Sequence, residues 1–264
     1  MKNKTPTKLT ELLRVAGRAL WRGKAYELTA YRNVEHFISV VGDLPLGEIR
    51  TTTIDDFVDE VRGTIKDATV NRKLTNVHSI LKYAFDREWI AKMPKFTWHA
   101  EDEGRIRWIT PAEEQSMFDL LTAWGETEVS RFVLVALETG MRRGELLNLE
   151  AKDIDGSWVR LWVNKTKKAR SVPLSETAEA ALAAGPFALD EYKLRVVWAR
   201  LKVAMGLEAD DDFVLHCLRH TRATRTLAKT GNLAMVQKLL GHRKIETTLR
   251  YAHISDDDLL AAVR

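Results

Sequence analysis

Residues 216–220 read HCLRH, residues 239–242 read LLGH, and Tyr251 follows nine positions after the end of the second piece. Upstream of both, residues 139–146 read TGMRRGEL. A histidine and an arginine three positions apart are common on an exposed helix face, so each piece alone is a weak signal. We therefore base the prediction of fold and function on the order and spacing of all the pieces together.

In this order the pieces resemble the tyrosine recombinase (phage integrase) family, over all of residues 110–255 and less specifically over residues 1–95. The resemblance carries over residue by residue. The first arginine of the family falls on Arg142, the hairpin lysine on Lys165, and the His-x-x-Arg pair on His216 and Arg219. The Gly-His position falls on His242 and the nucleophile on Tyr251. The resemblance thus implies a complete catalytic set: Arg142, Lys165, His216, Arg219, His242 and Tyr251.

The residue types suit attack on a phosphodiester, whose negative charge must be held while a nucleophile approaches. Arg142 and Arg219 each offer a planar guanidinium that can grip two phosphate oxygens. His216 and Arg219 are three apart, so on a helix they share a face and can reach the same phosphate. His242 can donate a hydrogen bond to a phosphate oxygen. We expect a 3′-phosphotyrosine intermediate and a free 5′-hydroxyl.

Proton transfer needs two more groups. An ordinary tyrosine has a pKa of about 10, so Tyr251 needs a base, and His216 is the candidate because imidazole titrates near neutrality. The leaving 5′-hydroxyl needs an acid, for which Lys165 is the best candidate. Lys167 and Lys168 are rivals, but we favour phosphate binding for both. Glu145 has no chemical step, and we expect it to orient Arg142 or a histidine.

No cofactor is expected. The phosphodiester energy is kept in the tyrosine link, and the sequence lacks both a P-loop and the clustered carboxylates of a two-metal nuclease. His220 lies beside His216, but side chains that diverge on a helix make a poor ligand pair, so we predict no metal site. Cys217 is the one cysteine, and we expect it to serve packing rather than reactivity.

The second half of the chain predicts helices around a small sheet. Thr110-Pro111-Ala112-Glu113 is a capping box, a specific sign of a helix start. Residues 157–163 alternate as a strand, with residues 171–173 as its partner, and we expect Trp158 and Trp162 on one strand face to be core residues. Helices are expected over residues 129–138, 190–205, 218–229 and 233–240, with Gly140, Gly231 and Gly241 as stops.

The first half predicts four helices, over residues 8–21, 26–41, 54–61 and 70–85. Residues 1–100 carry 17 Lys and Arg against 12 Asp and Glu, whereas the whole chain has a net charge of +4. A basic half suggests a polyanion partner, and we expect Arg72 and Lys73 to contact DNA phosphates. The domains predicted are a helical core-binding domain (1–95), a linker (96–108) and a catalytic domain with a C-terminal tail helix (109–264).

The fold class expected is mainly α with a small β-sheet, and the resemblance implies a C-shaped clamp around DNA. The function expected is site-specific recombination. The alternatives are strand cleavage and religation of the type IB topoisomerase kind, and a regulator that binds DNA without catalysis. The resemblance further implies a specific double-stranded DNA site, a tetramer on DNA and accessory DNA-bending proteins. Residues 255–264 suggest a short tail helix that docks on its own or a neighbouring protomer.

No apolar run approaches the roughly 18 to 20 residues that cross a bilayer, and residues 1–14 contain no signal peptide. We therefore expect a cytoplasmic, nucleoid-associated protein. The target DNA sequence, the direction of recombination and the phage, mobile-element or chromosomal role do not follow from the sequence.

Overall fold

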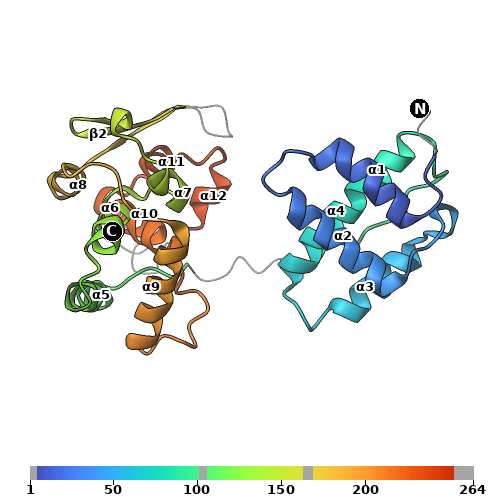
Figure 1. Ribbon diagram of the computed structural model, residues 1–264, viewed down its shortest axis with the longest axis horizontal. Coiled ribbons are helices and arrows are strands. Elements are labelled where there is room, and N and C mark those ends of the chain that lie inside the picture. The colour runs from blue at the N-terminus through green and yellow to red at the C-terminus, as the bar shows by residue number, and fades with distance from the viewer. Residues whose placement is uncertain (1–4, 101–105, 163–168, 253–264) are drawn as a thin grey trace, which may run out of the picture. The chain divides into compact units, whose positions relative to one another are not determined.

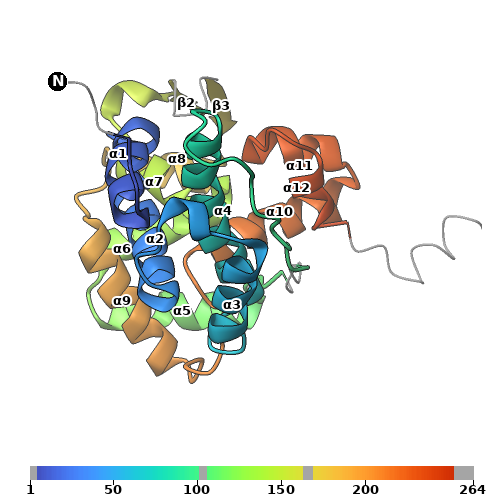
Figure 2. The ribbon, with the colours of Figure 1, turned by 90° about the vertical axis from the view of Figure 1, so that its right-hand side faces the viewer.

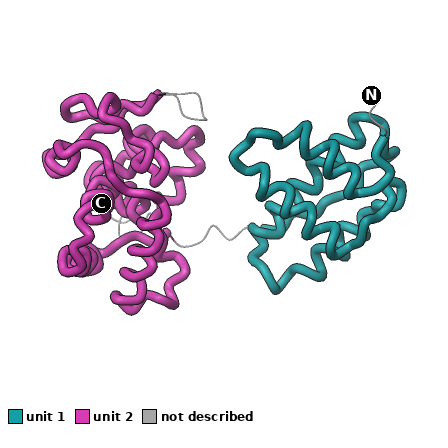
Figure 3. The backbone as a smooth tube through the Cα atoms, in the orientation of Figure 1, with its two compact units in different colours: residues 1–103 teal, residues 104–264 magenta. Residues whose placement is uncertain are grey.

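The computed structural model describes residues 5–100, 106–162 and 169–252. The chain divides into two compact units, residues 1–103 and 104–264, which Figure 3 distinguishes by colour. Each unit has its own hydrophobic core. Within the described residues, no helix is both long and apolar enough to pass through a bilayer.

The first unit is helical, as predicted. Its helices are α1 (Leu9–Trp21), α2 (Glu27–Val41), α3 (Thr51–Val61) and α4 (Asp67–Phe85), with a short 3₁₀ turn at Leu46–Glu48. Helix α2 packs against the other three, and α1 also packs on α4 (Figure 1). The apolar stripe of α4 is fully buried at Val70, Leu74 and Val77. Arg72 and Thr75, between these positions, are exposed on the outer face of the helix, whereas Asn71 is buried.

The predicted linker is attached to a unit at each of its described ends. Asn71 donates from Nδ2 to the carbonyl of His99 at 2.9 Å, and its Oδ1 accepts from the amide of His99 at 3.0 Å. At the other end, Arg107 donates from Nε to Asp210 at 2.8 Å, and Ile109, just past the predicted linker, is fully buried in the core of the second unit. The boundary between the units falls within this segment, at residues 103–104.

The second unit combines helices with one small sheet, which confirms the predicted fold class. Its helices are α5 (Pro111–Ala123), α6 (Thr127–Thr139), α7 (Arg143–Leu147), α8 (Glu176–Leu182), α9 (Glu191–Ala204), α10 (His216–Thr230), α11 (Leu233–Leu240) and α12 (Glu246–Leu249). The predicted capping box is present, since Thr110 Oγ1 accepts from the amide of Glu113 at 3.2 Å. Helix α10 packs against α6 (Figure 1) and also against α11, which in turn packs against α12 (Figure 2).

The sheet is antiparallel, in the order β1 (Ile154–Asp155), β2 (Trp158–Leu161) and β3 (Arg170–Pro173). Val159 pairs with Val172 and Leu161 with Arg170. The prediction that Trp158 and Trp162 belong to the core is wrong, because they are 44% and 61% exposed. The alternate positions Val159 and Leu161 face the core instead. A strand has one buried face, and the smaller aliphatic side chains occupy it here.

Candidate active site

Helix α10 carries three of the polar side chains from the sequence motifs on its first two turns. His216 is its first residue, and Arg219 and His220 follow one turn later. Residues three and four apart on a helix share a face. The rings of His216 and His220 accordingly lie 4.7 Å apart between centroids, at an angle of 89°. The expectation that these two histidines diverge is therefore wrong, although the described residues include no group of three His, Cys, Asp or Glu suited to a metal.

Arg219 connects the three sequence motifs. Its side chain is almost completely buried, at 2% exposure. Nη1 donates to the carbonyl of Gly140 at 2.6 Å, and Nη2 donates to the carbonyl of Leu240 at 2.5 Å. Burial, with Arg142 and Arg170 nearby, lowers the pKa of Arg219 to about 9, so the guanidinium still carries its charge at neutral pH. Arg219 thereby fixes the backbone next to Arg142 and next to His242.

Arg142 lies at the start of α7 and is held by Glu145. The amide of Arg142 donates to Glu145 Oε2 at 2.8 Å, and its Nη1 donates to Oε1 at 2.9 Å. The Glu145 side chain is 5% exposed, whereas that of Arg142 is 47% exposed. Glu145 thus holds Arg142 through two hydrogen bonds, and Arg142 presents its charge to solvent at a helix N-terminus.

Glu145 has a second partner that the sequence motifs do not include. Arg170, on β3, donates from Nη2 to Glu145 Oε2 at 2.5 Å and from Nη1 to the carbonyl of Leu239 at 2.5 Å. Burial opposes the charge of Glu145, but Arg170 and Arg142 outweigh it and hold the pKa below its ordinary value of 4.5. Arg170 therefore joins the strand that follows the Lys165 segment to the end of α11.

Two glycines permit these close approaches. Gly140 ends α6 at φ +64°, and a Cβ there would lie 2.8 Å from Leu240. Gly241 ends α11 at φ +66°, and a Cβ there would lie 2.6 Å from Arg170. Both positions combine a left-handed backbone with a neighbour in contact, so a side chain would be doubly unfavourable.

Tyr251 follows α12 and lies in a small apolar cluster with Ala223, Val236 and Leu240, at 7% exposure. Its Oη is 2.7 Å from Nδ1 of His220. His242 follows α11, with its ring nearly parallel to that of Tyr251 at 6.4 Å between centroids. His242 Nδ1 lies 2.9 Å from Oγ1 of Thr248. Tyr251, the predicted nucleophile, therefore lies next to His220 of α10 and next to His242.

Burial and the arginines set the protonation of these groups. Burial, followed by the nearby arginines and histidines, lowers the pKa of both His220 and His242 to about 4. Burial also lowers the pKa of His216, with Arg219 and Arg142 adding to the effect. Burial raises the pKa of Tyr251, although the positive charges of Arg219 and Arg250 act to lower it. At neutral pH His220 and His242 are therefore uncharged and Tyr251 holds its proton.

A cavity of about 690 Å³ opens beside Arg142, His216 and Arg219. Its other basic lining residues are Arg143, Arg195 and Lys202. A hollow with this many cations attracts an anion, and its volume admits a phosphodiester.

The other predicted site residues are three lysines of the 163–168 segment and two residues of the first unit. Lys165, Lys167 and Lys168 fall outside the described residues. Arg72 is exposed and Lys73 half-buried on α4, in the first unit. Cys217 is fully buried, and burial raises the pKa of its thiol to about 11, which is unsuited to a reactive cysteine.

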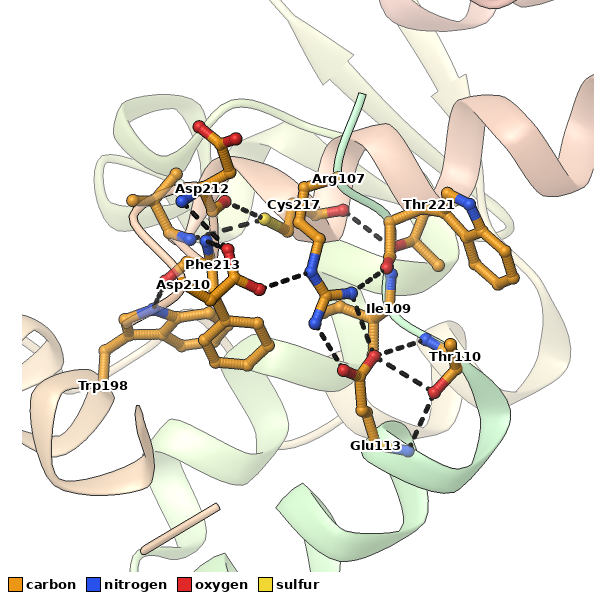
Figure 4. A network of polar contacts seen from close by, with 12 residues as sticks. Arg107, Ile109, Thr110, Glu113, Trp198, Asp210, Asp212, Phe213, Cys217 and Thr221 are labelled. Carbon is orange, nitrogen blue, oxygen red and sulfur yellow. Dashed lines mark hydrogen bonds and ion pairs between the residues drawn. The ribbon is translucent and has the colours of Figure 1, made fainter. Parts of the chain in front are cut away.

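A polar network holds the segment that leads into α10 (Figure 4). Arg107 donates from Nε to Asp210 at 2.8 Å and also pairs with Glu113 at the start of α5. Thr221 Oγ1 accepts from the amide of Ile109 at 2.8 Å. The network joins Arg107 and Ile109, which precede α5, to Asp210, which precedes α10, and to Thr221 within α10. It therefore fixes the position of the first turn of α10.

Replacing Arg107 by Met should destabilise the chain by about 2 kcal/mol at pH 7, the usual size for lost hydrogen bonds to charged groups. Arg107 lowers the pKa of Glu113 and of Asp210 below their ordinary values of 4.5 and 3.8. A lowered carboxyl pKa stabilises above the unfolded-state value and is lost as pH falls through the folded-state value. Urea unfolding should therefore show a difference between variant and wild type that shrinks below about pH 4.

Lys82→Met is the matched control, because the Lys82–Asp86 pair is about half exposed and should contribute little. An Arg107→Met defect of equal size at pH 7 and in acid would show that charge pairing is not the cause.

A family model and the two relatives described next all belong to phage integrases or tyrosine recombinases. The model of the family described as the phage integrase family matches residues 107–184 and 188–258. The tyrosine recombinase XerA of Saccharolobus solfataricus is 31% identical over 163 residues, which cover 59% of this chain and 56% of that protein. The integrase of Escherichia phage P2 is 26% identical over 238 residues, covering 87% of this chain and 68% of that protein.

Among solved structures, the Tn1549 transposon integrase in complex with circular intermediate DNA has a TM-score of 0.76 at 19% identity. The match covers 98% of this chain and all of that one. At this identity the likeness establishes a shared fold and nothing further.

Proposed function

The chain belongs to the phage integrase family, and from that premise we propose that it is a site-specific DNA recombinase that cleaves and rejoins DNA through a 3′-phosphate link to Tyr251. The observation that carries the proposal is the convergence of Arg142, His216, Arg219 and His242 with Tyr251, from four separate elements of one unit. Relatives with the names tyrosine recombinase and integrase support the same activity.

In the proposed reaction the target phosphate lies against Arg142 and His216, which line the basic cavity. Arg142 is an exposed cation there and can hold two of its oxygens. Arg219 is buried, so its main task is to keep the backbone around Gly140 and Leu240 in place while adding positive charge. His216 lines the same cavity and can donate a hydrogen bond to the phosphate. Fixed positive groups of this kind stabilise the charge that spreads over the phosphate oxygens in the transition state.

A recombination assay tests this function. DNA flanking the gene is sequenced to find a candidate site, and a plasmid with two copies of that site is incubated with the protein in excess EDTA without ATP. Exchange between the two sites is expected. Relaxation of supercoils without exchange would favour the topoisomerase alternative, and binding without any cleavage would favour the regulator.

We further propose that Lys165 protonates the leaving 5′-oxygen. Lys165→Ala should then slow cleavage of ordinary DNA about 10²- to 10⁴-fold, the usual contribution of a general acid. A 5′-bridging phosphorothiolate has a sulfur leaving group that needs no proton, so this substrate should be cleaved at nearly the wild-type rate. Pre-steady-state cleavage of both substrates is the measurement.

Lys168→Ala is the control for that experiment, and it should affect both substrates equally because it is assigned to phosphate binding. Equal defects on both substrates for Lys165→Ala would transfer the acid role to Lys167.

The first unit is proposed to bind the duplex through phosphate contacts, with Arg72 and Lys73 among them, so that the two units together clamp the DNA. Arg72 is exposed, and burial lowers the pKa of Lys73, so Arg72 should be the stronger contact. Arg72→Ala with Lys73→Ala should weaken binding to a duplex of arbitrary sequence. The slope of log affinity against log salt should fall by roughly one unit for each lost contact.

Lys82→Ala on the same helix is the control, because Lys82 is already paired with Asp86 at 2.6 Å. A double variant with an unchanged salt slope would place this face of α4 away from DNA.

Strand exchange between two duplexes requires four active sites, so a tetramer on DNA belongs to the proposal. Residues 255–264, which we expect to couple the protomers as a short helix, lie outside the described residues. Accessory DNA-bending proteins are a further proposed partner.

A further inference from the structure

The tyrosine hydroxyl already has a partner in this structure, and it is not the histidine of the His-x-x-Arg motif. Nδ1 of His220 lies 2.7 Å from Oη of Tyr251. The two rings are 5.7 Å apart between centroids and inclined at 53°. His216 instead faces the edge of the His220 ring and lines the basic cavity. The two histidines of α10 thus occupy different places, one toward the phosphate cavity and one against the nucleophile.

The charge states limit the forms that this hydrogen bond can take. A neutral imidazole has one ring nitrogen that donates and one that accepts, and a phenol has one proton to donate. Burial keeps the His220 ring uncharged at neutral pH, with a pKa of about 4, and keeps the Tyr251 hydroxyl protonated. In the arrangement proposed below, the Tyr251 hydroxyl donates to Nδ1 across this 2.7 Å contact, and the proton of His220 is on Nε2. This is the arrangement that a general base needs before reaction.

We propose that His220 is the catalytic base, which accepts the proton of Tyr251 at Nδ1 as Oη attacks the phosphate. This inference rests on the proposed function. In that step the O–H bond of Tyr251 breaks, the proton moves to Nδ1, and the Oη–P bond forms. The bond from phosphorus to the 5′-oxygen breaks, and that oxygen receives its proton from the separate general acid. On rejoining, Tyr251 leaves phosphorus and takes its proton back from Nδ1 of His220.

The position of His220 on α10 suits this task. It follows Arg219, whose bonds to Gly140 and Leu240 fix this turn of the helix. His220 is four residues after His216, so both project from the same side of α10 but one turn apart. Burial, His216 and the nearby Arg250 and Arg219 also make protonation of His220 costly until the DNA phosphate brings negative charge.

The hydrogen bond can be tested in the protein without DNA. In a ¹⁵N spectrum of the histidine rings, His220 should show a protonated Nε2 and an unprotonated Nδ1. The Nδ1 resonance should move in Tyr251→Phe, which lacks the hydroxyl. A protonated Nδ1 in the wild type would overturn the proposal.

The catalytic role can be tested by rescue with added base. The substrate is a nicked duplex that traps the covalent adduct, of a sequence selected from a random pool by binding to this chain. His220→Ala should form adduct about 10²- to 10⁴-fold more slowly than wild type. Added imidazole should restore part of that rate, and more basic imidazoles should restore more. His220→Asn should be as slow as His220→Ala, because its amide can keep a hydrogen bond but cannot take the proton.

His216→Ala is the matched variant, since it removes the same side chain one turn away. It should also be slow, because His216 faces the phosphate, but added imidazole should not accelerate it. Rescue of His216→Ala rather than His220→Ala would overturn the proposal and return the base role to His216. A wild-type rate for His220→Ala, or no rescue of that variant at any imidazole concentration, would overturn it as well. A wild-type protein that forms no adduct would instead overturn the proposed function itself.

Discussion

Tyr251→Phe should abolish the protein–DNA adduct that survives SDS, while DNA binding persists. The substitution removes one oxygen atom, which is the only atom of the side chain with a proposed bond to phosphorus. The aromatic ring should keep its place in the cluster with Ala223, Val236 and Leu240. His220 Nδ1 loses its partner, which should cost about 1 kcal/mol of stability, far too little to unfold the chain.

The measurement is gel analysis of a nicked suicide duplex together with a binding isotherm for each protein. Tyr192→Phe is the control, because Tyr192 is 78% exposed on α9 and should react as wild type. An adduct from Tyr251→Phe at the wild-type level would mean that another side chain is the nucleophile.

Arg219→Met should have the second-largest effect, and it should impair both stability and cleavage. The variant leaves the carbonyls of Gly140 and Leu240 without their donors in a buried region. Each unsatisfied buried group costs about 1 to 3 kcal/mol, so a loss of about 2 to 6 kcal/mol is expected. Cleavage should fall below detection, because the segments carrying Arg142 and His242 lose their common support along with a positive charge.

Arg219→Lys separates the two effects. It retains a charge but cannot donate to both carbonyls with a planar fork, so it should remain folded and still cleave poorly. Arg225→Met on the same helix is the control, because its pair with Glu114 is partly exposed and should contribute at most about 1 kcal/mol. An Arg219→Met protein as stable as wild type would contradict the role of Arg219 as a connector.

Most of the helical architecture could be predicted, because amphipathic periods and local capping signals carry it. The start of α5 at Thr110 and the ends of α6 and α11 at Gly140 and Gly241 depend on residues within a few positions of the boundary. Such local signals are readable from sequence. The buried face of β2 could not be predicted from the sequence, because tryptophan and valine alternate there and either set could have been the buried one.

The site was predictable only where a motif names the residue. Arg170 was missed because its partners, Glu145 and Leu239, are 25 and 69 positions away along the chain. Its place at the start of a strand, beside a basic segment, was the available signal. His220 was considered only as a metal ligand, although its spacing of four from His216 already placed both on one helix face. Its contact with Tyr251 depends on how α12 packs, which no local pattern reports.

The central claim is that Tyr251 becomes joined to a 3′-phosphate, and mapping of the covalent bond tests it most directly. The trapped adduct is digested with nuclease and trypsin, and the nucleotide-bearing peptide is sequenced by mass spectrometry. The ends of the released strand are identified by labelling. The account predicts a nucleotide attached through its 3′-phosphate to Tyr251, and a released strand whose 5′-hydroxyl can be phosphorylated directly. A nucleotide on any other residue, or a linkage through a 5′-phosphate with a free 3′-hydroxyl, would contradict it.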